Sequence, residues 1–248
     1  MSMVEQVAEH LIRGWRSDER QSHEGLILES EAQAYAVQQR VADALGWFAG
    51  APARAWKLGG APYSFISAAR VPTDAIHGSG WQVPPGYCQG FGIEAELVVR
   101  LGCDLDEHTD LATACSAIDA WLPGIELCDT RWLNADQAAP MLRLADQQLN
   151  RALIIGEPHL LAQMPDWSTQ TAQLRVNGVS QIHNTGSHPF VEPLNSLPWL
   201  ARHAAAQGDP LRAGDLIATG SWTGIYWAPL GVEVEVEFAG LGVVTLST

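Results

Sequence analysis

The sequence predicts an α+β protein in which a helical N-terminal region, residues 1–50, precedes a β-rich body, residues 51–248. Two observations support this division. Apolar residues recur at helical spacing before Gly50, whereas beyond it glycine and proline become frequent and apolar runs shorten to strand length. Strand patterns continue to the last residue, and we find neither a repeat nor a linker. We therefore expect one compact domain overall.

Two helices are predicted in the N-terminal region. The first contains Val4, Leu11 and Ile12 at helical spacing, and a polar stretch, residues 16–24, follows it. The second begins after Ser30, because a serine side chain accepts hydrogen bonds from the free amides at a helix start. Its apolar stripe consists of Ala34, Val37, Val41 and Leu45. We expect Gly46 or Gly50 to end this helix.

The body contains several segments that are typical of strands bounded by turn residues. They are AWKLGG, GIEAELVVRLG, LPGIELCDT, RALIIGEP, TAQLRVNGVS, DLIATGS, VEVEVEFAG and GVVTLST. The Asn-Gly pair in RVNGVSQI predicts a β-hairpin. Two helices are expected between the strands. One is DLATACSAIDAWL, from Asp110, and the other is NSLPWLARHAAAQG, with Asn195 as its cap, Pro198 in its first turn and Gly208 at its end.

Charge and cysteine usage argue against several classes of function. The formal net charge is −14 and the basic residues do not cluster, which disfavours a nucleic-acid partner. The four scattered cysteines form no CxxC pair, so we expect reduced thiols that pack as small core residues. The N-terminus lacks a signal-peptide pattern, and no window approaches the roughly 20 apolar residues that span a bilayer. We expect a cytoplasmic protein that does not bind a membrane.

A pair of carboxylates in GIEAELVVRLG is the first candidate for chemistry. In a strand, Glu94 and Glu96 lie on one face about 7 Å apart, and Val98 follows them there. The three glutamates of VEVEVEF share a face that has no apolar residue, and we interpret that segment as a solvated edge or outer strand. Val98 instead indicates a partly buried site, where a divalent cation would neutralise the repulsion between Glu94 and Glu96.

Glu126 in LPGIELCDT supplies a third carboxylate. It is a lone acidic residue between Ile125 and Leu127, and burying it is costly unless it is paired or bound to a metal. For the strand with Glu94 and Glu96, the alternative to a metal site is an ordinary amphipathic strand with a solvated acidic face, because many antiparallel strands carry polar residues on the face toward water.

The order of several motifs resembles the fumarylacetoacetate hydrolase superfamily. These motifs are AYAVQQRV, AWKLGG, GIEAELVVRLG, PGIELCDTRW and LRAGDLIATGSWTG, and the similarity extends from about residue 30 to the end. The most similar branch contains 2-hydroxypenta-2,4-dienoate hydratases and 4-oxalocrotonate decarboxylases. The resemblance implies a β-rich roll of mixed strands, a homo-oligomer, and Mg²⁺ or Mn²⁺ as the bound ion. The three metal carboxylates of the family match Glu94, Glu96 and Glu126, and its lysine matches Lys57.

The resemblance also indicates residues around the substrate. Ser221 matches a small hydroxyl residue that lines the site, with Thr223 nearby, and Gln147 stands in place of a family asparagine. The Gly-Asp turn of the family matches Gly214 and Asp215, where we expect the aspartate to shape the turn rather than to do chemistry.

The stretch VPTDAIHGSGW departs from the family pattern. The hydratases have an acidic residue shortly after the lysine strand, and here Asp74 lies near that place without matching it. His77 is another candidate proton carrier, because imidazole titrates near neutrality, although an ordinary buried or surface histidine is the favoured interpretation.

Together these features predict a metal-dependent hydro-lyase that acts on a small 2-oxo acid. It would add water to a 2-hydroxy-2,4-dienoate and give a 4-hydroxy-2-oxo acid. Three alternatives stay open. A decarboxylase of a 2-oxo-3-enedioate would use a basic group for the second carboxylate, for which Arg54 and Arg70 are candidates. The others are an acylpyruvate-type C–C hydrolase and a catalytically weak partner subunit that keeps the metal site.

Overall fold

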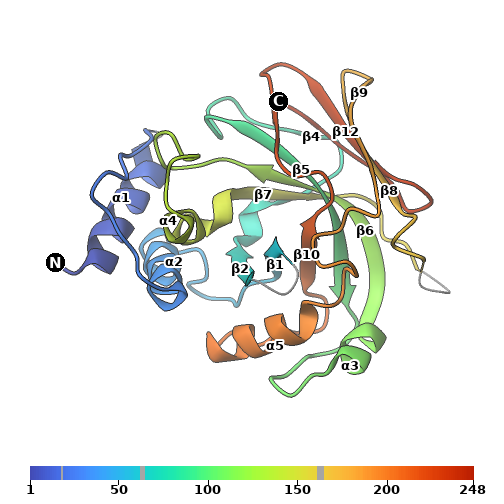
Figure 1. Cartoon of the computed structure of the whole chain (residues 1–248), viewed down its shortest axis with the longest axis horizontal. Helices are drawn as coiled ribbons and strands as arrows, with labels where there is room; N and C mark the ends of the chain where they lie inside the picture. Colours follow the sequence, from blue (N-terminus) through green and yellow to red (C-terminus); the bar gives the residue numbers. More distant parts are fainter. Residues whose placement is uncertain (18, 62–64, 161–164) are drawn as a thin grey trace.

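The computed structural model describes residues 1–17, 19–61, 65–160 and 165–248, and it confirms the α+β prediction (Figure 1). The helices are α1 Met3–Ser17, α2 Glu31–Leu45, α3 Leu111–Ser116, α4 Pro140–Ala145 and α5 Leu197–Ala206, with short 3-10 helices η1 Thr73–Ala75 and η2 Gln147–Leu149. The strands are β1 Ala55–Ala61, β2 Phe65–Val71, β3 Ile76–Gly78, β4 Trp81–Gln82, β5 Phe91–Leu101, β6 Ile118–Cys128, β7 Asn150–Ile155, β8 Thr171–Val176, β9 Val179–Thr185, β10 Leu216–Ser221, β11 Tyr226–Ala228, β12 Glu233–Phe238 and β13 Gly242–Ser247.

The described residues of the body form two sheets. The larger has the order β2-β1-β10-β5-β6-β7-β3, with β11 paired to β5, and the smaller has the order β4-β13-β12-β8-β9. Figure 1 shows α1, α2 and α4 gathered on one side of the larger sheet and the smaller sheet on the other side. Most buried apolar residues of both sheets form one core, whereas α1, α2 and α4 share a second apolar cluster that includes Val7, Val37 and Leu142.

The N-terminal helices follow the expected local signals. The Oγ atom of Ser30 accepts a hydrogen bond from the amide of Gln33 at 3.3 Å, so Ser30 caps α2 as predicted. Gly46 ends the helix with φ 71°, in the left-handed region that glycine adopts without steric cost. The predicted hairpin is also confirmed, because Asn177 and Gly178 between β8 and β9 have φ values of 49° and 76°.

The helix predicted from Asp110 is confirmed in its first half and wrong in its second half. Asp110 does cap α3, but the helix ends at Ser116 and the second half of the predicted segment belongs to β6. The reason is tertiary, because residues from Ile118 onward pair with β5 along almost its whole length. That ladder and the burial of β6 outweigh the local helical preference of an alanine-rich segment.

Two smaller predictions also need correction. Ser196 rather than Asn195 occupies the cap position of α5, and the Asn195 side chain donates to the carbonyl of Phe190 at 3.0 Å. VEVEVEF forms β12, which lies between β13 and β8 and is therefore an interior strand, although its glutamates do face outward. Arg175 on β8 pairs with two of those glutamates across the outer face.

None of the helices in the described part of the chain combines the length and the apolar run that a membrane crossing requires. The four cysteines are free, and Cys128 is buried. Cys103 is exposed, so the expectation that it packs as a core residue is wrong.

Candidate metal centre

The register of the larger sheet brings the predicted carboxylates to one face. β5 and β6 are antiparallel, and Glu94 lies directly opposite Glu126, while Glu96 lies opposite Gly124. Lys57 on β1 is opposite Ala218 on β10, which is in turn opposite Val98 on β5. Because directly opposed residues share a face and alternate residues return to it, Lys57 lies on the same face as the carboxylates. The predicted placement of Val98 beside Glu96 is confirmed.

Lys57 and Glu126 form the buried centre of this face. The Nζ atom of Lys57 lies 3.2 Å from Oε1 of Glu126, and the two side chains are only 6% and 0% exposed. Asn150 donates from Nδ2 to the same Glu126 oxygen at 3.0 Å. Lys57 also donates to the carbonyl of Gln148 at 3.3 Å. Lys57 is the only lysine in the sequence. Its ammonium group is buried beside Glu126.

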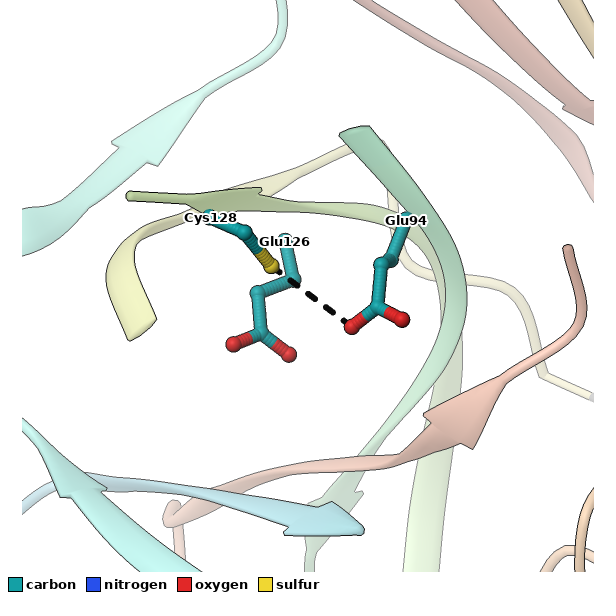
Figure 2. Close-up of side chains that lie close together, drawn as sticks. All are labelled: Glu94, Glu126 and Cys128. Atoms are coloured by element: carbon teal, nitrogen blue, oxygen red, sulfur yellow. Dashed lines mark hydrogen bonds between the residues drawn. The ribbon is translucent and has the colours of Figure 1, made fainter. Parts of the chain in front are cut away.

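Cys128 completes a group of donor atoms that the sequence did not lead us to expect. Donor atoms of Glu94, Glu126 and Cys128 all lie within 4.8 Å of one another. Figure 2 shows the three side chains close together. The Sγ atom of Cys128 is 3.6 Å from Oε2 of Glu94. The sequence did contain a signal for this placement. Cys128 follows Glu126 by two residues in the same strand, and this spacing puts both side chains on one face.

Glu96 stands slightly apart from that group. It shares the face, but the backbone amide of Gly220 donates to its Oε2 at 2.6 Å, and it is not among the donors that lie within 4.8 Å of one another. Ser221 lies directly opposite Glu96, and its Oγ is buried without a hydrogen-bond partner among the described residues. Thr223 accepts from the amide of Ala95 at 3.0 Å and so fastens the loop after β10 to β5.

An unpaired oxygen tests whether these residues suit a cation. Oε2 of Glu126 is buried and has no hydrogen-bond partner within the part of the chain that the structure describes. A buried carboxylate oxygen without a partner costs free energy, and a divalent cation would supply the missing partner. The donor set of carboxylates around this oxygen therefore fits a hard or borderline divalent ion.

The pKa values of the group follow from burial and mutual charge. Burial raises the pKa of Glu126 to about 7, although Lys57 opposes this rise. Burial, with the charges of Glu126 and Glu94, raises the pKa of Glu96 well above its ordinary value. Burial alone would lower the pKa of Lys57, but the neighbouring carboxylates outweigh it and raise that pKa instead. These charges therefore favour the protonated ammonium form of Lys57.

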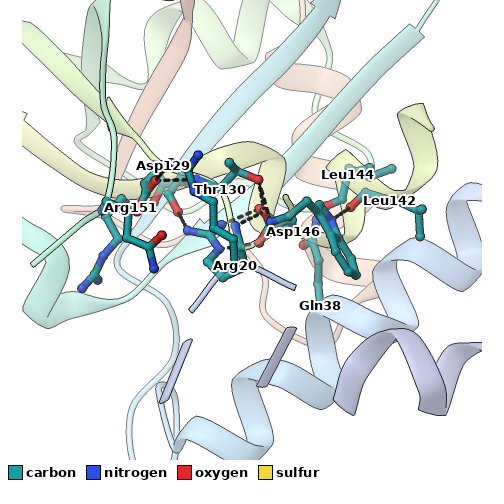
Figure 3. A network of polar contacts seen from close by, with 12 residues as sticks. Arg20, Gln38, Asp129, Thr130, Leu142, Leu144, Asp146 and Arg151 are labelled. Atoms are coloured by element: carbon teal, nitrogen blue, oxygen red, sulfur yellow. Dashed lines mark hydrogen bonds and ion pairs between the residues drawn. The ribbon is translucent and has the colours of Figure 1, made fainter. Parts of the chain in front are cut away.

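A strained turn carries the carbonyl that contacts Lys57 and leads directly into Asn150, which contacts Glu126. Gln147, Gln148 and Leu149 in η2 have φ values of 52°, 52° and 69°, and such left-handed conformations cost about 1–3 kcal/mol each for residues other than glycine. Asp146, the residue before this turn, belongs to the polar network in Figure 3. Asp146 accepts from the backbone amide of Arg131 at 2.9 Å and from its Nε at 2.5 Å.

Gln147 is placed beside the carboxylates rather than among them. It lines a cavity of about 310 Å³ together with Asp74 and Arg151. Asn150 also lines this cavity and contacts Glu126, so the cavity adjoins the candidate centre. It is the carbonyl of the next residue, Gln148, that contacts Lys57.

Several other predicted residues lie away from the centre. His77 is opposite Ile154, which is opposite Ile125, so His77 lies on the face that faces away from Glu126. It stacks on Trp81 with ring centroids 3.7 Å apart. This placement is against His77 as the proton carrier.

The two candidate arginines are engaged elsewhere. Arg54 pairs with Asp215 at 3.2 Å, and Arg70 lies 3.7 Å from Asp209. Arg70 is also opposite Trp56, on the face away from Lys57. Asp215 accepts from the amide of Arg212 at 2.7 Å, which fits the expected role in shaping a turn.

Comparisons with known proteins agree with this architecture. The family model described as fumarylacetoacetate (FAA) hydrolase, C-terminal, matches residues 38–247. The TodF product hydratase of Pseudomonas putida F1 is 31% identical over 157 residues, which cover 62% of this chain and 57% of that protein. The 4-oxalocrotonate decarboxylase of a Pseudomonas species is 28% identical over 156 residues, 63% of this chain and 60% of that protein. The 2-keto-4-pentenoate hydratase of Paraburkholderia xenovorans LB400 is 28% identical over 171 residues, 68% of this chain and 63% of that protein. The matched part of the chain thus spans less than two thirds of the length of these relatives.

Solved structures extend the likeness to almost the whole chain. The 4-oxalocrotonate decarboxylase from Pseudomonas putida G7, complexed with magnesium and adipate, superposes with a TM-score of 0.86 at 23% identity, covering 98% of this chain and 96% of that one. The fumarylpyruvate hydrolase from Pseudomonas aeruginosa, in complex with Mn²⁺ and pyruvate, has a TM-score of 0.60 at 18% identity, covering 79% of this chain and 89% of that one. These likenesses confirm the expected β-rich roll.

Proposed function

Because this chain belongs to the fumarylacetoacetate hydrolase family, we propose that it is a divalent-metal-dependent hydro-lyase of its hydratase and decarboxylase branch. The proposed reaction adds water to a 2-hydroxy-2,4-dienoate, the enol form of a 2-oxo-enoate, and gives a 4-hydroxy-2-oxo acid. The observation that carries the proposal is the opposed pair Glu94 and Glu126, with the buried ammonium of Lys57 3.2 Å from Glu126.

Glu94, Glu96 and Glu126 would hold the ion, and Mg²⁺ or Mn²⁺ suits their oxygen donors. The bound ion supplies Lewis-acid stabilisation of negative charge on the oxygens of the substrate. Relatives in solved structures carry magnesium or Mn²⁺, which supports this choice of metal.

Lys57 would act electrostatically. Its pKa is raised by the surrounding carboxylates, so it keeps its proton and its positive charge near neutral pH. A fixed buried cation stabilises the negative charge that develops on the C2 oxygen when the dienol gives up its hydroxyl proton. Proton transfer at carbon then falls to another group or to water.

Ser221 would bind the substrate. Its buried hydroxyl has no partner among the described residues and lies opposite Glu96, so a bound 2-oxo acid can satisfy it. Gln147 and Thr223 are the weaker assignments, because Gln147 lines the adjoining cavity and Thr223 already bonds Ala95 and Gly224.

Decarboxylation is the alternative that the relatives themselves suggest. Arg54 and Arg70, the basic groups considered for a second substrate carboxylate, both pair with aspartates away from the centre. Neither arginine is therefore placed to bind a second substrate carboxylate. Arg151 lines the cavity beside the centre, so a basic group for the decarboxylase substrate is still present there.

The test follows the ultraviolet absorbance of a 2-hydroxy-2,4-dienoate with Mg²⁺ or Mn²⁺ present. We expect loss of absorbance without carbon dioxide release, and a loss of at least about 100-fold in kcat/KM for Glu126→Gln. Glu237→Gln on the outer face of β12 is the matched control and should keep full activity. Full activity of Glu126→Gln would refute the site.

The other candidate functions give different products. Carbon dioxide release would indicate the decarboxylase, and two acid products would indicate the C–C hydrolase. Binding of Mn²⁺ and oxalate without turnover of any 2-oxo-enoate would indicate the catalytically weak subunit. The homo-oligomer implied by the resemblance stays a prediction, which light scattering on the purified protein tests.

A further inference from the structure

We propose that Cys128 is a ligand of the metal ion, which makes this a mixed centre of carboxylate oxygens and one thiolate sulfur. The inference rests on the proposed function in one respect, namely that an ion binds between Glu94 and Glu126. It goes further by giving the ion a sulfur ligand, so that the centre selects thiophilic ions such as Co²⁺ and Zn²⁺ more strongly than carboxylates alone would.

The spacing of the donors is the first argument. Sγ of Cys128 and Oε2 of Glu94 are 3.6 Å apart, and the Glu126 donor lies within 4.8 Å of both. An oxygen and a sulfur bound to one ion, at about 2.1 and 2.3 Å, are at most about 4.4 Å apart. The thiol and Glu94 therefore already stand close enough to share an ion.

The surroundings of the thiol are the second argument. Cys128 is fully buried and lies directly opposite Gly92 on β5. A Cβ atom at Gly92 would come 2.9 Å from the Cβ of Cys128, so the absence of a side chain there makes room for the cysteine. Oε2 of Glu126, in a side chain that is 0% exposed, has no hydrogen-bond partner among the described residues, so this carboxylate has an oxygen free to bind an ion.

Glu96 supplies the third argument. Its Oε2 accepts the Gly220 amide at 2.6 Å, and it stands outside the group of donors within 4.8 Å of one another. Cys128 thus joins Glu94 and Glu126 in the compact group. Glu96, on the same strand face, would be a further carboxylate ligand beside this group.

Ligation by this thiol has defined chemical consequences. The ion replaces the thiol proton, which passes to solvent, and a sulfur–metal bond forms without any change of oxidation state. Thiolate is a soft donor that favours Co²⁺ and Zn²⁺, whereas carboxylates suit Mg²⁺ and Mn²⁺. Replacing Cys128 should therefore weaken binding of the first pair of ions far more than binding of the second pair.

Cobalt spectroscopy on the full-length protein tests the proposal without any activity measurement. Co²⁺ bound to a thiolate gives an intense sulfur-to-metal charge-transfer band in the near ultraviolet, in addition to weak visible bands. We expect this band in the wild type and in the control Cys88→Ser, whose thiol lies outside the donor group. We expect Cys128→Val and Cys128→Ser to lose it and to keep the visible bands. The exposed Cys103 is replaced by serine in each variant and in the parent protein that stands for the wild type.

Calorimetry supplies the second measurement. Cys128→Val should weaken Zn²⁺ binding by at least about tenfold and change Mn²⁺ binding by much less. Three results would overturn the proposal: cobalt binding to the wild type without the charge-transfer band, a band that persists in Cys128→Val, or equal losses of Zn²⁺ and Mn²⁺ affinity in that variant. Each would leave the thiol as a hydrogen-bond donor to Glu94. Failure of the wild type to bind any of these ions would overturn the proposed function as well.

Discussion

Replacing the buried ammonium by an apolar side chain of similar length, Lys57→Met, should destabilise the metal-free protein in a way that depends on pH. The Lys57–Glu126 separation is 3.2 Å. At an effective dielectric constant of about 20, the attraction across it is about 5 kcal/mol, or roughly four pKa units. Without Lys57, the pKa of Glu126 should therefore rise from about 7 to well above 9.

The pH dependence of the unfolding free energy depends on the pH at which Glu126 loses its proton in the wild type and in Lys57→Met. The pKa of Glu126 is raised on folding, so the stability that it contributes is fully present below the unfolded value of 4.5 and is lost as the pH rises through the folded value. Between these values both proteins lose stability at the same rate. Above about pH 7 only Lys57→Met goes on losing it, by about 1.4 kcal/mol per pH unit. The difference between the two proteins should grow by about 3 kcal/mol from pH 7 to pH 9.

Urea denaturation with EDTA at pH 6, 7, 8 and 9 measures this difference. Arg175→Met is the matched control, because Arg175 pairs with Glu235 and Glu237 on an open strand face, and its loss should cost at most about 1 kcal/mol at every pH. A Lys57→Met difference that is constant from pH 6 to pH 9 would refute the inferred charge coupling.

Three further predictions concern the same face. The apparent affinity for Mn²⁺ should rise by up to about tenfold per pH unit as the pH increases through 7, because the pKa of Glu126 is raised to about 7 and this carboxylate must ionise to bind. Calorimetry from pH 5.5 to 8.5 measures this affinity, and a flat profile would disprove the prediction. In protein labelled with ¹³C at the lysine side chain, the single Lys57 signal should not titrate below pH 10, since its pKa is raised; a titration near neutrality would contradict the electrostatic role. Gly124→Ala should cost about 1–3 kcal/mol, because the new Cβ would lie 2.6 Å from Cγ2 of Val98, and an unchanged Tm would show that the strands give way easily.

The strand-based part of the site was accessible from the sequence. Alternation decides which side chains share a face, so the residue pattern alone places Glu94, Glu96 and Val98 correctly. The conjunction of Glu94 with Glu126 is not a local property. It depends on the register between β5 and β6, in which Glu94 lies opposite Glu126. The order of the motifs indicates that the two glutamates belong to one site, but only the structure gives the register.

The remaining parts depend on contacts that no local pattern encodes. The role of Cys128 depends on its position opposite Gly92, a pairing between residues far apart in the chain. The helix predicted from Asp110 is wrong beyond Ser116 because pairing with β5 overrides the helical preference of that segment. His77 is a candidate for chemistry on the strength of its pKa range alone, and only the pairing of β3 with β7 shows that it points to the other face.

The carboxylates on β5 and β6 also distinguish the two faces of these strands during folding. Glu94 and Glu126 are the features that separate one face of each strand from the apolar face of Ile93 and Ile125. A slip of one residue between β5 and β6 would drive Glu126 into the hydrocarbon core, which makes misaligned pairings costly. A variant with leucine at the glutamate positions would lose this safeguard. Its strands would be apolar on both faces, and competing alignments would become nearly equal in energy, with slow or heterogeneous refolding as the result. The residues proposed to hold the ion therefore also guide the chain to a single alignment before any ion arrives.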